Sequence, residues 1–438
     1  MGELFLALDY IDSFIWSYLG VPCLSLVGLY LTFKLRFMQL TKVRLIVASI
    51  TSQLTKKGDK SSSHHSKGVA PLQAFFSSIG GCIGIGNLVA VCSAIQIGGP
   101  GALVWMWTAA FLGMLIKYAE VYLGCRYRVV DTTTGSYAGG PMYYLQKVFK
   151  TPLVPVLVAI LLALYGTETY MFNVVTDSIT SNWHIDRSLI IAVLLILILI
   201  AGKGGIKLVG SICSFIIPLF LVLYVGMCLW VLLQHSSKIL PSLQIIFSSA
   251  FGGKTILAGG AAGSFIVTMS EGMARGCYSG DIGVGYASVV NAESHAQDPR
   301  VQARMAIFGV FIDTFIVCTS TALLVITTGV STQNLPASQL VQAALSSEFS
   351  MMNFFMPVFI FLLGYSSMIA FYVVGLKCAG FLHKRYGQTV YTVYASLMFI
   401  VFSFVDQTVA LTLMSLVGAS LLLLNVYGIF KLRSHIEV

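Results

Sequence analysis

Two glycine-rich stretches interrupt hydrophobic, membrane-length segments at corresponding places in the two halves of the chain. The first is Gly80-Gly81-Cys82-Ile83-Gly84-Ile85-Gly86-Asn87, and the second runs from Arg275 to Gly285 through Ser279-Gly280-Asp281-Ile282-Gly283. Because unpaired backbone groups are costly in lipid, a helix breaks at membrane depth only where the break lines a cavity or a ligand site. Half-helix N-termini bind anions and free carbonyl groups bind small cations, so a zwitterionic amino acid with sodium would match both groups. The pattern predicts a secondary transporter with its substrate site at mid-membrane.

Composition indicates a polytopic membrane protein. Of the 438 residues, 57% are hydrophobic and 10% are charged, whereas soluble proteins carry about 25% charged residues. The nine cysteines include no CxxC pair, which argues against a disulfide framework or a metal cluster. No nucleophile motif or phosphate-binding loop occurs, so we expect no enzyme and no cofactor besides a coupling ion. The net charge of +9 is interpreted as a topology signal, not as a nucleic-acid surface.

The hydrophobic pattern predicts eleven membrane-spanning helices, since about 20 apolar residues cross a bilayer. The predicted spans are residues 13–33, 70–97, 101–125, 153–175, 188–202, 208–233, 257–290, 303–328, 353–376, 388–404 and 407–430. The second and seventh are long because each contains a glycine-rich break. All eleven are expected to form one transmembrane domain, residues 1–438.

Lysine and arginine residues predict the orientation. If the N-terminus lies outside, the outside segments keep only Arg187, Lys238 and Lys254, and the cytoplasmic segments hold 21 basic residues, including those of the polar loop Lys56–Lys67. Because basic loops stay in the cytoplasm, the N-terminus is predicted outside and the C-terminus inside.

This topology predicts an inverted repeat. Helix 2 then runs outward and helix 7 runs inward, and each begins a set of five helices. The first repeat spans residues 70–233 and the second 257–430, after an extra N-terminal helix at 13–33. Inverted repeats of this kind are typical of secondary transporters.

Short motifs distributed over residues 70–375 identify a family resemblance. They are Gly84-Ile85-Gly86-Asn87, Gly98-Gly99-Pro100-Gly101-Ala102, Trp105-Met106-Trp107, Lys117-Tyr118-Ala119-Glu120, Gly139-Gly140-Pro141-Met142-Tyr143-Tyr144, Gly204-Gly205-Ile206-Lys207 and Phe311-Ile312-Asp313-Thr314. Together they resemble the alanine or glycine:cation symporter family. The resemblance implies an all-α, LeuT-like protein of a prokaryotic inner membrane that couples sodium to uptake of a small neutral amino acid such as alanine or glycine. Because one chain would supply the whole pathway, we expect a monomer.

The chain departs from the family pattern where the family's site lies. Cys82 and Ile85 replace two threonines of the first break, and Met171 replaces a glutamine on helix 4. On helix 9, Ser366-Ser367 stands where the family has Thr-Thr, and Phe371 replaces a tryptophan. The resemblance therefore implies a retained scaffold with a changed pocket.

The predicted substrate-binding residues line the two breaks and the facing part of helix 9. They are Gly81, Cys82, Ile85, Gly86, Tyr278, Gly280, Asp281, Ser367 and Phe371. Backbone groups of Gly81, Cys82 and Gly86 are expected to hold the substrate's carboxylate. Ile85, Tyr278 and Phe371 are expected to pack against the substrate's side chain, which should be small or medium and apolar. The alternative interpretation is that the glycines only permit close helix packing.

Ser366 and Ser367 place two hydroxyl groups on helix 9, and sodium, like other hard cations, prefers several oxygen ligands. With the carbonyl groups of Gly80, Ile83 and Leu363 they would form a sodium site that resembles the LeuT-like arrangement. Alternatively, both hydroxyls bond to their own helix backbone.

Asn87 marks a less favoured second sodium site. Its expected neighbours Cys82 and Gly280 offer no side-chain oxygen. Asp313 on helix 8 is either a second cation ligand or a helix-packing contact.

Ionisable residues within membrane spans are costly and are functional by default. Glu271 and Arg275 are four residues apart and predict an ion pair on one helix face, either structural or part of a gate. Lys117 and Glu120 are interpreted as a helix-surface pair. Glu168 has no evident partner and could carry a coupling proton.

Glu168 keeps an alternative function open, a proton-coupled or uncoupled amino-acid carrier or exchanger on the same fold. A channel is disfavoured, since channels build rings of like residues from several subunits.

Overall fold

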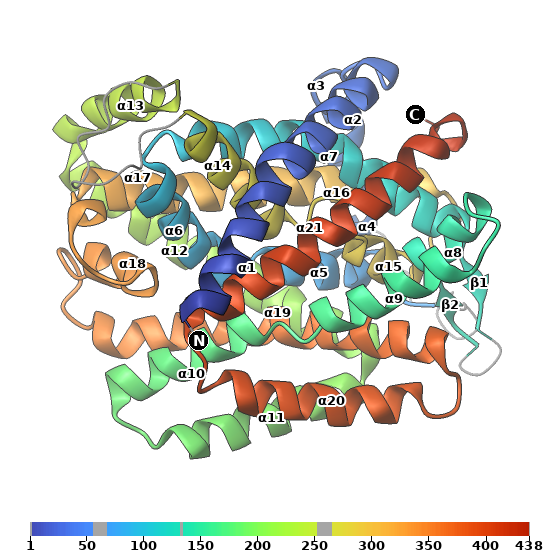
Figure 1. Ribbon diagram of the computed structural model, residues 1–438. Helices are drawn as coiled ribbons and strands as arrows, with labels where there is room; N and C mark the ends of the chain where they lie inside the picture. Colours follow the sequence, from blue (N-terminus) through green and yellow to red (C-terminus); the bar gives the residue numbers. More distant parts are fainter. Residues whose placement is uncertain (1, 56–67, 132–134, 252–264, 438) are drawn as a thin grey trace.

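The computed structural model describes residues 2–55, 68–131, 135–251 and 265–437, nearly all of them helical (Figure 1). The predicted loop Lys56–Lys67, the predicted outside residue Lys254 and the start of the seventh predicted span, 257–264, lie outside these residues.

The first half of the chain holds thirteen numbered α-helices and one small hairpin within the described ranges. In order they are α1 (Gly2–Ile15), the π-helical η1 (Trp16–Gly20), α2 (Val21–Lys34), α3 (Met38–Thr41), α4 (Val43–Thr55), α5 (Pro71–Cys82), η4 (Ile85–Asn87), α6 (Val89–Gly98), α7 (Ala102–Arg126), β1 (Val129–Val130), β2 (Tyr137–Ala138), α8 (Pro141–Tyr144), η5 (Leu145–Lys147), α9 (Leu153–Tyr165), α10 (Thr169–Trp183), α11 (Arg187–Lys203), α12 (Gly205–Gln234) and α13 (Ser236–Ala250). The strands β1 and β2 pair antiparallel, with Val129 opposite Ala138.

The second half is helical throughout its described part. It consists of α14 (Phe265–Gly280), α15 (Tyr286–Ala292), α16 (Pro299–Val310), the π-helical η6 (Phe311–Cys318), α17 (Thr319–Thr327), η7 (Val330–Thr332), α18 (Ala337–Leu345), α19 (Met352–Leu382), α20 (Gly387–Phe402), α21 (Gln407–Lys431) and η8 (Arg433–His435).

Each predicted span coincides with helix, but not all are long. Within the described residues, seven helical stretches have the length and apolarity to cross a membrane, and the pair α5 and η4–α6, bent by 45°, makes an eighth. The other three predicted spans correspond to the shorter helices α11, α14 and α20. The count of eleven spans therefore stays a prediction, whereas the all-α membrane fold is observed.

The structure adds helices that the hydrophobic pattern does not predict. Helix α4 follows the first span and packs on α16, α13 packs on α7 and α17, and α18 packs on α6. The outer sides of α4 and α13 still carry apolar residues, such as Val47, 43% exposed, and Phe247, 52% exposed. Each of the three helices is too short to give a span-length apolar run. The fourth predicted span also differs from the structure, where it is divided into two separate helices, α9 and α10.

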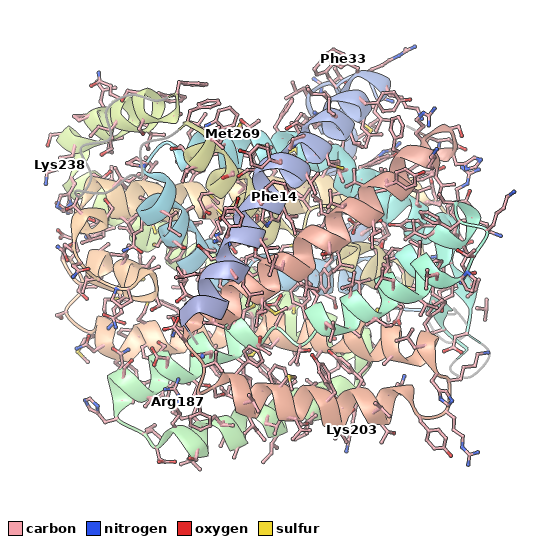
Figure 2. All side chains as sticks on the ribbon, in the orientation of Figure 1. Phe14, Phe33, Arg187, Lys203, Lys238 and Met269 are labelled. Atoms are coloured by element: carbon pink, nitrogen blue, oxygen red, sulfur yellow. The ribbon has the colours of Figure 1, made fainter. Side chains whose placement is uncertain are left out.

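The buried centre is formed by α5, α7, α14, α15 and α19, with the N-terminal rod α1–η1–α2 beside α21 on the face nearest the viewer in Figure 1. The rod can approach α7 closely at Gly28, where a Cβ atom would lie 2.7 Å from the Cβ of Leu112. Figure 2 shows the labelled Lys238, Arg187 and Lys203 at the edges of the molecule. Apolar side chains such as Phe33 on α2, 66% exposed, cover the outer faces of helices, as expected for a surface that lipid solvates.

Candidate functional site

The first break separates α5 from α6 and confirms the predicted interruption. The N–H of Ile83 donates the last α5 hydrogen bond to the carbonyl of Ile79 at 2.7 Å. Ile83 and Gly84 are then extended, and a 3-10 turn follows. The N–H of Gly84 donates to Asn87 Oδ1 at 2.8 Å, so a side chain holds the unwound segment.

The second break separates α14 from α15, also as predicted. Asp281, Gly283 and Gly285 all have left-handed backbone conformations, with φ of 46°, 72° and 103°. For the two glycines this conformation is cheap, whereas for an aspartate it is uncommon. Val69, just before α5, pairs with Ser294, just after α15, so the two broken spans lie antiparallel.

A third break, between α9 and α10, is missed by the sequence interpretation. Residues 166–168 join the two helices, and Glu168 has a φ of 43°. Gly166 is needed because α19 passes close by: a Cβ atom there would lie 2.8 Å from the carbonyl oxygen of Phe371. The segment carries no glycine run and sits in an apolar span, so the hydrophobic pattern gave little sign of it.

Lys117 on α7 connects the two predicted breaks. Its ammonium donates to the carbonyl groups of Gly280 at 2.8 Å and Asp281 at 2.9 Å, and lies 3.4 Å from the sulfur of Cys82. Lys117 is 2% exposed and Glu120 is wholly buried. The helix-surface interpretation of this pair is therefore wrong, because α14 and α15 pack over α7 and enclose both charges.

Asn87 lies in a cluster rich in side-chain oxygen. Its amide nitrogen donates to Asp313 Oδ1 at 2.6 Å and to Ser279 Oγ at 3.0 Å. Ser279 also donates to both carboxylate oxygens of Asp313, and Thr314 Oγ1 donates to Asp313 Oδ2 at 2.9 Å. The argument against a cation at Asn87 is thus wrong, since its hydrogen-bond partners Ser279 and Asp313 both carry side-chain oxygen. The π-helical turn η6 brings Asp313 to this position.

The two serines of α19 behave differently. Ser367 Oγ donates to the carbonyl of Gly80 across the helix interface at 2.7 Å, whereas Ser366 Oγ donates to Leu363 in its own helix at 2.9 Å. The structure therefore brings the predicted sodium-site residues of α5 and α19 together. Ile83 is wholly buried beside them, at the end of α5.

The predicted substrate residues of the first break divide into two groups. Gly81 and Cys82 lie in the last turn of α5, where N–H groups already serve helix hydrogen bonds. Their predicted role as N–H donors to a carboxylate therefore does not fit this geometry. Gly86 lies beyond the helix end, with room for a Cβ atom 3.6 Å from Ser279 and Tyr278. Ile85 packs on α19 at Gly364.

Aromatic rings close the space between the breaks. Phe371 lies 5.4 Å from the ring of Tyr165 and 4.2 Å from that of Tyr286, centroid to centroid. Tyr278 packs on Tyr165 and Tyr170, at 6.5 and 6.4 Å. Tyr278 and Phe371, predicted to close on the substrate together, are therefore linked through Tyr165, which sequence reasoning missed because it lies in an unbroken apolar stretch.

Two carboxyl groups occupy the second and third breaks. Tyr278 donates to Glu168 Oε2 at 3.2 Å, and Tyr165 donates to Asp281 Oδ1 at 3.4 Å. Glu168 is wholly buried and Asp281 is 1% exposed. The predicted ion pair also forms, with Arg275 3.3 Å from Glu271, one helical turn before the second break.

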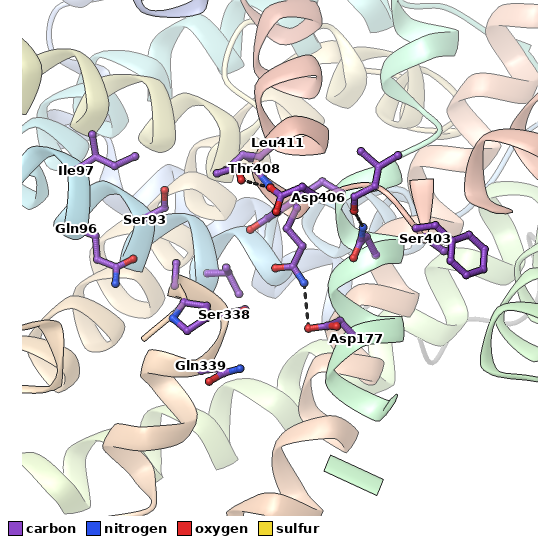
Figure 3. A pocket seen from close by; sticks show the side chains of 18 of the residues that line it. Ser93, Gln96, Ile97, Asp177, Ser338, Gln339, Ser403, Asp406, Thr408 and Leu411 are labelled. Carbon is purple, nitrogen blue, oxygen red and sulfur yellow. Dashed lines mark hydrogen bonds between the residues drawn. The ribbon is translucent and has the colours of Figure 1, made fainter. Parts of the chain in front are cut away.

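A cavity of about 790 Å³ opens at one end of the molecule (Figure 3). It lies between α6, α10, α18 and the turn before α21, and its polar lining includes Gln96, Asp177, Gln339 and Asp406. Tyr170 lines the same cavity, so one tyrosine ring separates it from Tyr278 and the second break.

A second cavity, of about 430 Å³, opens at the opposite end of the broken spans. It lies between the β1–β2 hairpin, α15 and the C-terminal part of α19. Glu293 and Lys377 line it and form an ion pair. The breaks therefore lie between two cavities, one at each end of the broken spans.

Comparisons with known proteins agree with this geometry. The model of the sodium:alanine symporter family matches residues 2–437. An uncharacterised transporter of Haemophilus influenzae is 34% identical over 330 residues, 74% of this chain and 70% of the relative. The sodium/alanine symporter AgcS of Methanococcus maripaludis is 29% identical over 414 residues, 92% and 88% of the two chains. The crystal structure of MhsT with L-phenylalanine matches with a TM-score of 0.59 at 13% identity, over 84% of this chain and 90% of the other. The last match confirms the LeuT-like fold.

Proposed function

Because the chain belongs to the sodium:alanine symporter family, we propose that it is a secondary active transporter that couples sodium to the uptake of a small neutral amino acid, such as alanine or glycine. The observation that carries the proposal is the hydrogen bond from Ser367 to the carbonyl of Gly80, which joins α19 to the end of α5 at the first break. A sodium ion placed there would be coordinated by both oxygens in place of that hydrogen bond, and would hold the two helices together. The relative named a sodium/alanine symporter supports the same substrate and ion.

The distribution of buried charge also favours cation coupling. Around the breaks, the described residues include four buried carboxyl groups, of Glu120, Glu168, Asp281 and Asp313. The buried cations there are the ammonium of Lys117 and the guanidinium of Arg275, which is already paired with Glu271. Buried charges need compensation, so this region favours the arrival of cations. A sodium ion bound by Gly80, Ile83, Leu363, Ser366 and Ser367 would supply part of the positive charge that compensates these carboxyl groups.

A second cation fits the cluster around Asn87. The Oδ1 of Asn87 accepts from Gly84, and the hydroxyls of Ser279 and Thr314 each lie within 3.2 Å of the Asp313 carboxylate, so the cluster supplies several hard oxygens. Asp313→Asn keeps the shape but removes the charge. We expect it to raise the sodium concentration for half-maximal uptake about tenfold or more and to lower the number of sodium ions per substrate, measured as the Hill coefficient of sodium-dependent uptake. Asp298→Asn, at the half-exposed start of α16, is the control. An unchanged sodium curve for Asp313→Asn contradicts the second site.

We place the substrate's carboxylate at the 3-10 turn that begins at Ile85, with Gly86 as the backbone donor. Gly86→Ala should retain uptake, because a Cβ atom meets its neighbours at 3.6 Å. Gly86→Leu should abolish uptake, because the longer side chain enters the space beside Tyr278. Uptake of labelled alanine into proteoliposomes measures both, and normal membrane insertion of each variant is the control. Normal transport by Gly86→Leu would remove the substrate from this break.

The two cavities define the proposed pathway. With the N-terminus outside, the 790 Å³ cavity is the outer vestibule and the 430 Å³ cavity with Glu293 and Lys377 is the inner one. The two halves of a single domain, 70–233 and 257–430, would move relative to each other around the breaks, in a monomer embedded in a prokaryotic inner membrane.

The competing function is proton-coupled or uncoupled amino-acid transport, favoured by Glu168, a buried carboxyl group at a break. Uptake of labelled alanine with sodium replaced by choline separates the two. Loss of uptake in choline supports sodium coupling. Undiminished uptake in choline that follows an imposed proton gradient would show that protons, and not sodium, are the coupled ions.

A further inference from the structure

Glu168 and Asp281 are held by a reciprocal pair of tyrosines. Tyr165, just before the third break, donates to the carboxylate of Asp281 in the second break. Tyr278, just before the second break, donates to the carboxylate of Glu168 in the third break. The two tyrosine rings meet edge to face, at 84°. Both acidic residues have left-handed backbone conformations, an uncommon state that persists where the surroundings enforce it, often at functional sites.

Each carboxyl group keeps one oxygen without a hydrogen-bond partner among the described residues. These are Oε1 of Glu168 and Oδ2 of Asp281, and both are fully buried. An unpartnered buried acceptor is costly, and native proteins retain one chiefly where a ligand, ion or water completes it. Two such oxygens on adjoining breaks point to a missing donor between them.

The missing donor carries positive charge. Lys117 lies beside Asp281 and donates to its carbonyl at 2.9 Å. Among the described residues, the Glu168 carboxyl group forms no ion pair, and its hydrogen bond comes from the neutral hydroxyl of Tyr278. The charge of Glu168 thus lacks a fixed counter-ion. The same breaks already hold one primary ammonium, that of Lys117 on two carbonyl groups, which shows the chemistry that the backbone there accepts.

We propose that Glu168 and Asp281 are the acceptors for a primary ammonium group of the transported substrate. The inference rests on the proposed function, and it assigns the cationic end of the substrate to the second and third breaks and the anionic end to the first. An ammonium has three N–H donors, enough for both unpartnered oxygens and one further acceptor. The hydroxyl groups of Tyr165 and Tyr278 hold the two carboxyl groups through their other oxygens.

Ligand-induced thermal shifts of the purified protein test the proposal with two matched pairs of probes. L-alanine and propanoate differ by the α-ammonium, and L-lysine and L-norleucine differ by the side-chain ammonium. We expect the wild-type protein to prefer the ammonium-bearing member of at least one pair. Glu168→Gln and Asp281→Asn should each reduce that preference about tenfold or more. A reduction in the alanine pair assigns the α-ammonium, and one in the lysine pair assigns the side-chain ammonium.

Asp12→Asn is the matched control, because Asp12 is a buried carboxyl group on α1, outside the breaks, whose Oδ2 accepts from Ser415 at 3.0 Å. It should keep the preference. A sodium-induced thermal shift shows that each variant is folded, and Glu168→Asp, which keeps the charge, should retain more of the preference than Glu168→Gln.

Two results would overturn this inference and leave the proposed function standing. In the first, both Glu168→Gln and Asp281→Asn keep the wild-type preference in both pairs of probes. In the second, Glu168→Gln changes only the pH dependence of uptake, which would assign a proton to Glu168. If the wild-type protein binds none of the four compounds, the proposed function fails and the inference fails with it.

Discussion

Substituting Ser367 by alanine is expected to abolish the sodium dependence of substrate binding, whereas Ser366→Ala should retain most of it. The hydroxyl of Ser367 contacts the carbonyl of Gly80 on the facing helix, and the hydroxyl of Ser366 is directed to its own helix. Only the first connects α19 to the broken span, so only its loss uncouples a cation there from the break. Coupling between two ligands is typically 5- to 150-fold in affinity. We therefore expect sodium to raise alanine affinity by about that factor in the wild-type protein, and by close to onefold in Ser367→Ala.

Equilibrium binding of labelled alanine to purified protein, in sodium and in choline, measures the factor directly. Because linkage is reciprocal, alanine should raise sodium affinity by the same factor in each variant. Ser367→Thr keeps the hydroxyl and is the control. Full sodium dependence in Ser367→Ala, or equal losses in the two alanine variants, would show that the cation does not bind between α5 and α19 in the way proposed.

Local sequence signals predicted the breaks that consist of glycine. The glycines of Gly84-Ile85-Gly86-Asn87 each disfavour helix, and the charge of the loops gives the direction of each span. Both breaks and the antiparallel course of the broken spans could therefore be predicted from pattern and charge. The break at Glu168 could not be found in this way. There the chain leaves helical geometry because α19 crosses at Gly166 and because Tyr278 holds the glutamate, and both contacts come from distant segments.

Partners far apart in the sequence also explain the errors in the candidate site. Asn87 and Asp313 are separated by 226 residues, and a π-helical turn that no local pattern predicts aligns them. Lys117 and Glu120 are three residues apart, which is the spacing of a surface ion pair, yet each finds its nearest partners on other helices. Charges inside an apolar span thus marked positions that the structure buries at or beside the breaks, but which groups they meet depends on tertiary packing.

Lys117→Met is expected to cause the largest loss of stability among the changes considered. Methionine fills a similar volume without charge. It leaves the carbonyl groups of Gly280 and Asp281 without their donor and the carboxylate of Asp281 without its nearest cation. Removing one partner of a buried charged pair typically costs about 3–5 kcal/mol, so the purified variant should unfold at a clearly lower temperature and should not transport. Lys207→Met, at an exposed position at the start of α12, is the matched control.

The double variant Lys117→Met with Asp281→Asn distinguishes charge compensation from simple packing. If the ammonium stabilises the second break by offsetting the carboxylate, removing both charges should recover part of the stability lost in the single variant, since residues in contact do not act additively. If Lys117 acts only through the two carbonyl groups, the double variant should be as unstable as the single one. Wild-type thermal stability together with wild-type uptake in Lys117→Met would show that the second break is held by other contacts, and that the ammonium seen between the breaks is dispensable for the transport pathway.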